Sequence, residues 1–200
     1  EIMLLSGVKI VELGQNLAGP YGTQILADLG AEVIKVERPT GDDARGWGAQ
    51  VTDDTTTMYQ TLNRNKKSVT LDLKSSDDME KMMALLADAD IFLHNLRPGT
   101  PTKLGIGPTE MCAKFPRLIY CDVGAFGHIG PLKDQPGYEP LMQAYGGLVS
   151  INGHPDGKVA RIAVSLIDLG TGMWSAIGAL AALHHRHETG KGAIINTSLY

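Results

Sequence analysis

The sequence has little cysteine, few aromatic residues and no excess of positive charge. Its two cysteines, Cys112 and Cys121, have no CxxC spacing, which argues against a disulfide framework and favours a reducing, cytoplasmic setting. Lys and Arg number 18 against 22 Asp and Glu, so no broad basic surface for nucleic acid is expected. The longest apolar stretch, 170–183, contains Thr, Ser and Gly and is expected to be too short to cross a membrane.

Hydrophobic residues make up 43% of the 200-residue chain, and they form short apolar runs that alternate with helical patterns. The runs predict strands at 8–13, 31–36, 68–73, 90–94, 117–123 and 193–199. Apolar spacings of three and four predict helices at 20–29, 75–87, 108–114, 141–149 and 169–188. This alternation is typical of an α/β, doubly wound fold, with a mostly parallel, Rossmann-like sheet and helices on both faces.

Two long segments, 39–57 and 124–140, are rich in Gly, Pro and polar residues and are predicted to be loops. Long loops inside a compact domain are usually functional or disordered. A third segment, 152–159, is predicted to be turn-rich.

The turn after the first predicted strand contains Gly14, Gly19 and Gly22. A dinucleotide-binding turn would read GxGxxG, with an acidic residue about 20 positions later. Glu37 has the right position for that acid, but the glycine spacing is wrong and Pro20 occupies the turn. A βα turn closed by glycines is therefore favoured over NAD binding. The N-terminus of the helix that follows can still receive anionic groups or carbonyl oxygens.

Several basic residues lie close to the ends of predicted strands: Arg38, Arg64, Lys66, Lys67, Arg97 and Lys103. In a doubly wound sheet, ligands bind where the carboxyl ends of the strands meet. Arg38 and Arg97 are expected to share that edge, which would suit a phosphorylated ligand. Scattered, solvated bases are an equally good interpretation of the composition alone.

Several motifs in the correct order carry a resemblance to a known family. They are LSGVKIVE at 5–12, AGP at 18–20, LADLGAEVIKVERP at 26–39, Gly41-Asp42 with Arg45, LNRNKKS at 62–68 and NLRPG at 95–99. With them the chain resembles the class III coenzyme A transferases, which include formyl-CoA transferase and have the α-methylacyl-CoA racemases as relatives. The resemblance covers essentially the whole chain.

The resemblance implies an organisation larger than this chain. Family members are about twice as long, so residues 1–200 are expected to be the CoA-binding large domain, without the smaller domain. Two family chains interlink, so a homodimer is expected. No prosthetic group is implied, because coenzyme A or acyl-CoA acts as a substrate together with a carboxylic acid.

The resemblance also implies roles for individual residues. Asp168 corresponds to the catalytic aspartate, and Tyr138, Trp47 and Tyr59 are candidates for the acyl site. The expected contacts with coenzyme A are Gln15, Asn16, Leu17, Ala18, Arg38, Leu62, Asn63, Lys66, Asn95, Leu96, Arg97 and Lys103.

Asp168 stands just before the predicted helix 169–188, where an N-cap is its ordinary role. A cap and a nucleophile can coexist, because a helix N-terminus stabilises the ionised carboxylate. The implied chemistry is attack by Asp168 on an acyl-CoA, through a mixed anhydride and an aspartyl-CoA thioester. Backbone amides near residues 15–18 could stabilise the oxyanions.

Three alternatives bear on this interpretation. The racemases use a Gly-His-Asp string, whereas this chain has Gly137-Tyr138-Glu139 and its His128 is out of register. Formyl-CoA transferase has glutamine where this chain has Leu17, which favours another acyl donor. A non-catalytic CoA-binding fragment is the second hypothesis, because the covering half of the family chain is missing.

His184, His185 and His187 lack a completing ligand, so no metal site is expected.

Overall fold

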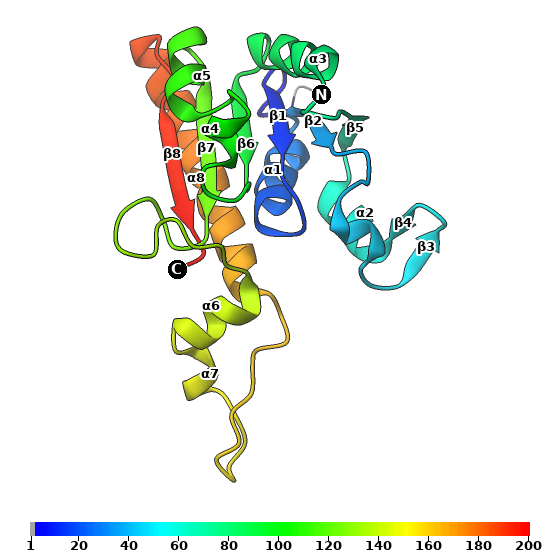
Figure 1. Ribbon diagram of the computed structural model, residues 1–200, viewed down its shortest axis with the longest axis vertical. Coiled ribbons are helices and arrows are strands. Elements are labelled where there is room, and N and C mark those ends of the chain that lie inside the picture. The colour runs from blue at the N-terminus through cyan, green and yellow to red at the C-terminus, as the bar shows by residue number, and fades with distance from the viewer. Residues whose placement is uncertain (1–2) are drawn as a thin grey trace.

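The computed structural model describes residues 3–200, built around a six-stranded parallel sheet in the order β5-β2-β1-β6-β7-β8 (Figure 1). Its strands are β1 (Lys9–Leu13), β2 (Glu32–Glu37), β5 (Lys66–Thr70), β6 (Ile91–His94), β7 (Ile119–Gly124) and β8 (Ile194–Ser198). The chain starts at β1, runs outward to β5 and returns past β1 to the other half of the sheet. This is the strand order of the doubly wound Rossmann fold, so the predicted fold class is confirmed.

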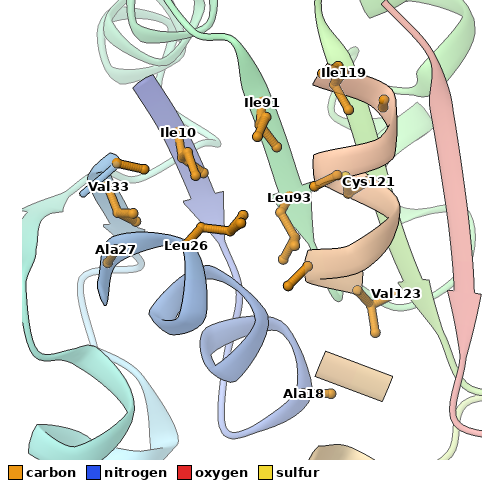
Figure 2. Packing of buried hydrophobic residues seen from close by; sticks show 14 residues of the cluster. Ile10, Ala18, Leu26, Ala27, Val33, Ile91, Leu93, Ile119, Cys121 and Val123 are labelled. Atoms are coloured by element: carbon orange, nitrogen blue, oxygen red, sulfur yellow. The ribbon is translucent and has the colours of Figure 1, made fainter. Parts of the chain in front are cut away.

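Helices lie on both faces of the sheet. They are α1 (Ala18–Asp28), α2 (Thr57–Asn63), α3 (Ser76–Ala87), α4 (Thr100–Lys103), α5 (Pro108–Lys114), α6 (Glu139–Tyr145), α7 (Leu148–Ile151) and α8 (Leu166–Thr189). Of these, α6 and α7 lie beyond the edge of the sheet (Figure 1). Buried residues of α1 and α8 pack together on one face (Figure 2), and those of α3 and α5 pack on the other. Because every strand points the same way, all carboxyl ends lie along one edge, called here the carboxyl edge.

Small residues let α8 lie close to the sheet and to α1. Ala176, Ala179 and Ala182 of α8 are buried against the face that carries Ile10 and Ile91 (Figure 2). The backbones of α1 and α8 also meet directly, since a Cβ added at Gly172 would lie 2.8 Å from the carbonyl oxygen of Ala18. This contact sets the second turn of α8 against the first turn of α1.

The connection from β7 to β8 has unusual handedness. The strands β6, β7 and β8 follow one another outward from β1. The connection from β6 to β7 runs through α4 and α5 on one face of the sheet, whereas the connection from β7 to β8 runs through α8 on the other face. A parallel crossover is right-handed in about 98% of cases, and the β7–α8–β8 crossover is left-handed. The consequence is local: α8 begins beside α1, instead of on the α3 and α5 face.

The segment between β7 and α8 extends beyond the carboxyl edge (Figure 1). The predicted helix 141–149 is two helices, α6 and α7, because Gly147 adopts a left-handed φ of 86° between them. The turn-rich segment closes through a bridge between Gly153 and Val159. The segment thereby presents α6 to the start of α8.

Three other boundaries differ from the predictions. The segment 39–57 contains a 3₁₀ turn at Asp43–Gly46 and a two-stranded hairpin, β3 (Gln50–Thr52) and β4 (Thr55–Thr56). β5 lies two to three residues earlier than predicted, because Lys66 and Lys67 pair with β2 despite their charge. The short helices α2 and α4 were not predicted at all.

α8 is longer than predicted. The expectation that this stretch is too short to cross a membrane is wrong, because the 24-residue helix is long and apolar enough to do so by length and composition, and about a third of its most apolar stretch is buried inside the protein. It packs along α1, β7 and β8, as core helices of α/β proteins do.

Candidate active site

A cavity of about 230 Å³ opens at the carboxyl edge, where β1, β2 and β5 end. Its walls also include residues that follow β6 and residues of α4. The lining residues are Leu13, Gly14, Gln15, Val36, Glu37, Arg38, Pro39, Gly41, Asp42, Leu71, Asp72, Leu73, Lys74, Leu96, Thr100 and Leu104. The position beside β1, where the chain reverses its direction across the sheet, is where doubly wound folds bind ligands. This space is called here the edge cavity.

Several residues predicted to contact coenzyme A lie at the edge cavity. Gln15, Arg38 and Leu96 line it directly. Arg97 and Lys103 are exposed on the segment that follows β6, at the same edge. The predicted sharing of one edge by Arg38 and Arg97 is thus confirmed. Of the cavity residues, Asp72 and Lys74 were missed, and only their position just after a strand could have indicated them.

Another group of predicted contacts lies away from the cavity. Leu62 and Asn63 are buried, and the side chain of Lys66 is 1% exposed. The Lys66 ammonium donates to Glu12 Oε2 at 2.7 Å and to the Pro20 carbonyl at 2.8 Å. Burial lowers the pKa of Lys66 to about 8 against the raising effect of Glu12. In this structure these three residues support the fold from within.

Arg64 and Lys67, the two basic residues on either side of Lys66 in this segment, are also paired within the protein. Arg64 pairs with Asp28, and Lys67 pairs with Glu32. Both lie near the amino end of β5, which is the opposite edge of the sheet from the cavity. Arg38, at the carboxyl edge, is also paired, since it forms an ion pair with Asp43 and donates to the Gly41 carbonyl at 2.9 Å.

Glu37, in the position of a ribose-binding acid, is already engaged by the protein. Arg45 donates a hydrogen bond to each of its two carboxylate oxygens at 2.8 Å, and Tyr59 and Ser68 donate to Oε1. Burial alone would raise the pKa of Glu37, but these hydrogen bonds hold it well below its usual range. A carboxylate so fully engaged has little capacity left for a ribose, which agrees with the unfavourable glycine spacing.

The backbone of the β1–α1 loop is held by side chains from three other elements. Lys35 donates to the Gly14 carbonyl at 2.9 Å. Asn95 accepts from the Gln15 N–H at 2.9 Å and donates to the Gln15 carbonyl at 2.8 Å. The next N–H, that of Asn16, donates to Asp42 Oδ1 at 2.9 Å. The backbone groups of Gln15 and Asn16, two of the predicted contact residues, are therefore used to fix the shape of the loop.

These contacts narrow the set of possible oxyanion donors. The N–H groups of Gln15 and Asn16, both included in the predicted set, already have acceptors. In an α-helix the first N–H groups have no intrahelical partner, and Leu17 is the N-cap of α1. The donors that remain are the N–H groups of Leu17, Ala18 and Gly19.

Asp168 lies inside the first turn of α8, not before it. Ser165 is the N-cap, so Asp168 is the third helical residue and the predicted cap role is wrong. The missing cap comes from another helix. Glu139 of α6 accepts from the Asp168 N–H at 2.7 Å and from the Ile167 N–H at 3.3 Å. A carboxylate at the first-turn amides satisfies donors that a helix otherwise leaves open.

The side chain of Gln143 holds Glu139 in this position. Its amide donates to Glu139 Oε1 at 2.6 Å and to the Ile162 carbonyl at 3.1 Å, while its oxygen accepts from the Ile162 N–H at 2.8 Å. Glu139 is 5% exposed and Gln143 is fully buried. The start of α8 is thus joined to α6 by partly buried hydrogen bonds to Glu139, which Gln143 holds in place.

The charge state of Asp168 differs from the prediction. The helix N-terminus was expected to keep the carboxylate ionised, but burial and the nearby negative charge of Glu139 raise the pKa of Asp168 to about 7. Glu139 occupies the helix amides that would have stabilised the Asp168 carboxylate. A buried carboxyl group with a strongly raised pKa at an open edge is a recognised mark of a functional site.

The three residues proposed for the acyl site lie in different environments. Tyr138 is the N-cap of α6, next to Glu139, and is 65% exposed. Trp47 is 49% exposed after the 3₁₀ turn. Tyr59 is buried, with its hydroxyl bonded to Glu37 and its ring under Arg45, so it packs within the protein and does not face the edge. Tyr138 is therefore the one adjacent to the Asp168 site.

The fold and the site define a Rossmann-like α/β protein with a cavity at its carboxyl edge and, at the start of α8, a half-buried Asp168 next to the buried Glu139. The model of CoA-transferase family III matches residues 5–200. The chain belongs to that family.

Similar proteins include succinyl-CoA–D-citramalate CoA-transferase of Chloroflexus aurantiacus, 41% identical over 197 residues, and succinyl-CoA:glutarate CoA-transferase of Mus musculus, 39% identical over 196. The alignments cover 98% of this chain and 49% and 45% of those proteins. A solved CAIB/BAIF family protein from Brucella suis has a TM-score of 0.95 at 38% identity, covering all of this chain and 54% of that one. The chain spans about half the length of the curated relatives it matches.

Proposed function

We propose that this protein is the CoA-binding and nucleophile-bearing part of a transferase that moves coenzyme A from an acyl-CoA donor to a carboxylic acid. The proposal rests on one observation above others: Asp168 has a raised pKa beside Glu139, at the edge of the sheet that also holds the cavity. Curated relatives named for CoA transfer from succinyl-CoA and acetyl-CoA support the same class of reaction.

The nucleotide end of coenzyme A fits the edge cavity by chemistry. Apolar walls from Leu71, Leu73 and Leu96 suit an adenine ring, and Arg38 supplies a cation for phosphate. Arg97 and Lys103 add positive charge at the same edge. The pantetheine arm would then run past the β1–α1 loop toward the start of α8.

The reaction begins at the Asp168 carboxylate. It attacks the thioester carbonyl of the donor, and the C–S bond breaks to release the CoA thiolate and leave a mixed anhydride. The thiolate then attacks the Asp168 carbonyl, which releases the donor acid and forms an aspartyl-CoA thioester. With a pKa of about 7, roughly half of the Asp168 groups are ionised at neutral pH.

The second half repeats these steps with the acceptor. The acceptor carboxylate attacks the aspartyl thioester, gives a new mixed anhydride and frees the thiolate once more. The thiolate attacks the acceptor carbonyl, which yields the new acyl-CoA and the free Asp168 carboxylate. The N–H groups of Leu17, Ala18 and Gly19 are the loop donors available for the tetrahedral oxyanions.

Relatives named for glutarate, D-citramalate and oxalate suggest small carboxylic acids as acceptors, and succinyl-CoA as the first donor to test. Tyr138, which precedes Glu139 at the start of α6, is the candidate side chain for contact with the acyl group. The proposal includes residues 1–200 as one CoA-binding domain, a homodimer and a cytoplasmic location.

Trapping tests the proposal. The chain is incubated with succinyl-CoA, treated with hydroxylamine and digested, and mass spectrometry looks for a hydroxamate at Asp168, with Asp168→Asn as the control. A hydroxamate confined to Asp168 is the expected result. Coenzyme A binding without any adduct would support the binding-only fragment instead. Exchange of the donor's α-proton in deuterated water would support the racemase alternative.

A further inference from the structure

The Gly41-Asp42 and Arg45 motif has no role in the chemistry above, yet it joins the edge cavity to the β1–α1 loop. Gly41 and Asp42 line the cavity, in the loop that follows β2. The Asp42 side chain points away from solvent and is 3% exposed. A buried carboxylate of this kind needs partners. Oδ1 has two N–H donors, whereas Oδ2 has no hydrogen-bond donor among the described residues and faces only the charge of Lys35.

Asp42 reaches the loop through both of its oxygens. Oδ1 accepts from the Asn16 N–H and from the Ala44 N–H, each at 2.9 Å. Oδ2 lies 2.9 Å from the Lys35 ammonium, which in turn donates to the Gly14 carbonyl. One side chain of the cavity loop therefore holds the backbone at Gly14 and at Asn16.

The backbone held in this way has an uncommon conformation. Asn16 has a φ of 61°, in the left-handed region, which asparagine adopts more readily than other non-glycine residues. Such conformations persist when the surroundings over-determine them. The next residues, Leu17 to Gly19, carry the N–H groups that the proposed reaction uses for oxyanions. A shift of Asp42 would be transmitted to them through Asn16.

Arg45 fixes the other side of the cavity loop. The Asp42 N–H donates to Glu37 Oε2 at 3.0 Å, and Arg45 donates to the same oxygen at 2.8 Å. A Cβ at Gly41, whose φ is 76°, would lie 3.0 Å from the Arg45 side chain. The motif thus forms a continuous path from β2 through Asp42 to the loop before α1.

We propose that Asp42 is a positioning residue that couples occupation of the edge cavity to the conformation of residues 14–17. The proposal rests on the proposed function, because that function places the nucleotide in the cavity and the acyl group near α1. Leu17 does not line the cavity, so a response of its N–H to a cavity ligand reports transmission. Gln15 lines the cavity and would respond directly.

The test uses ¹⁵N–¹H spectra of the 200-residue chain with adenosine 3′,5′-bisphosphate, which is the nucleotide end of coenzyme A alone. The variant is Asp42→Asn, which has one acceptor oxygen and so cannot serve both Asn16 and Lys35. The matched control is Asp53→Asn, at an exposed turn. The expected result is a Leu17 shift in the wild type and in the control, reduced at least four-fold in Asp42→Asn, with affinity changed less than three-fold.

Two outcomes overturn the proposal in distinguishable ways. Binding with an unreduced Leu17 shift in Asp42→Asn refutes the coupling and leaves the proposed function intact. No binding of the bisphosphate to the wild type refutes both. If Asp42→Asn does not fold, hydrogen exchange of the Asn16 N–H in the unmodified chain decides: saturation with the bisphosphate should slow it at least five-fold, and unchanged exchange contradicts the coupling.

A kinetic readout separates positioning from mere structural support. In the trapping reaction, Asp42→Asn should lower the rate of adduct formation at saturating succinyl-CoA about ten-fold. The concentration for half-saturation should stay within three-fold of the wild type. A change in half-saturation alone would assign Asp42 to binding and overturn the proposal.

Discussion

Two groups of buried charges near the carboxyl edge obey opposite electrostatic rules. In the network beneath the cavity, every carboxylate faces a cation: Glu12 faces Lys35 and Lys66, and Glu37 faces Arg45. At the start of α8, Asp168 faces the carboxylate of Glu139 instead. The pKa of Glu12 is lowered to about 2 by its two lysines despite burial, whereas that of Asp168 is raised to about 7.

The difference separates support from reactivity. Charges that satisfy one another stay ionised and hold the loops in place, so they have little tendency to react. A carboxylate kept near another negative charge is more basic and gains by losing its charge, which an acylation achieves. The network is therefore expected to matter for stability, and the Asp168 pair for chemistry.

The largest expected effect comes from removing the Asp168 carboxylate, which leaves the network beneath the cavity unchanged. Asp168→Asn should lower adduct formation with succinyl-CoA by about 10³-fold or more, because the nucleophilic oxygen is lost. Mass spectrometry after hydroxylamine treatment measures this. Adduct formation at wild-type rates in this variant would mean that another residue is the nucleophile.

The next largest effect comes from removing a cation of the network beneath the cavity. Lys35→Met leaves Glu12 and Asp42 with less compensation in a buried place, so the free energy of unfolding should fall by about 3–5 kcal/mol. Lys67→Met is the matched control on the next strand, since its pair with Glu32 is exposed and should be worth less than about 1 kcal/mol. Urea unfolding measures both. Equal losses in the two variants would contradict the assigned difference.

The close backbone contact between α1 and α8 can be disrupted without changing either group of charges. Gly172→Ala would place a methyl group 2.8 Å from the Ala18 carbonyl oxygen and should destabilise the fold by about 1–3 kcal/mol. Gly170→Ala meets nothing within 4 Å among the described residues and should stabilise α8 by up to about 1 kcal/mol. Thermal unfolding compares them, and opposite signs are expected. Destabilisation by both would show that helix propensity does not decide the effect at Gly170.

The smallest effect concerns pH. Because the folded pKa of Asp168 is raised, the native state holds its proton up to about pH 7 while the unfolded chain loses it near pH 4. Wild-type stability attributable to this group is thus present below pH 4 and is lost as pH rises toward 7. Asp168→Asn should be nearly equal to the wild type at pH 4 and more stable at pH 8, by no more than the about 4 kcal/mol that a shift of about three pK units gives. The reverse order at pH 8 would contradict the raised pKa.

Much of the supporting architecture could be predicted from sequence. Parallel strands are buried on both faces, so their Val- and Ile-rich runs stand out, and the order of strands and helices follows. Arg38 and Arg97 could be placed at one edge because each follows a strand. The resemblance then supplied Asp168, whose surroundings on α8 are those of a functional carboxylate.

What could not be predicted depends on distant contacts. The cap of α8 comes from Glu139, 29 residues before Asp168, and no local pattern announces it. Lys66 was expected to contact coenzyme A because of the resemblance of segment 62–68, yet its side chain is buried and Glu12 compensates its charge inside the protein. The handedness of the β7–α8–β8 crossover opposes a strong rule, so sequence reasoning would place α8 on the wrong face.

Direct titration of Asp168 tests the central claim, that burial and Glu139 together keep this carboxyl group poised between its two charge states. NMR of the side-chain carboxyl carbon across pH 3–9 gives the midpoint in the wild type and in Glu139→Gln, which keeps the shape but removes the charge. The account predicts a midpoint near 7 in the wild type and a lower one, still above the ordinary value, in the variant. A wild-type midpoint near 4, or one that Glu139→Gln leaves unchanged, would contradict it.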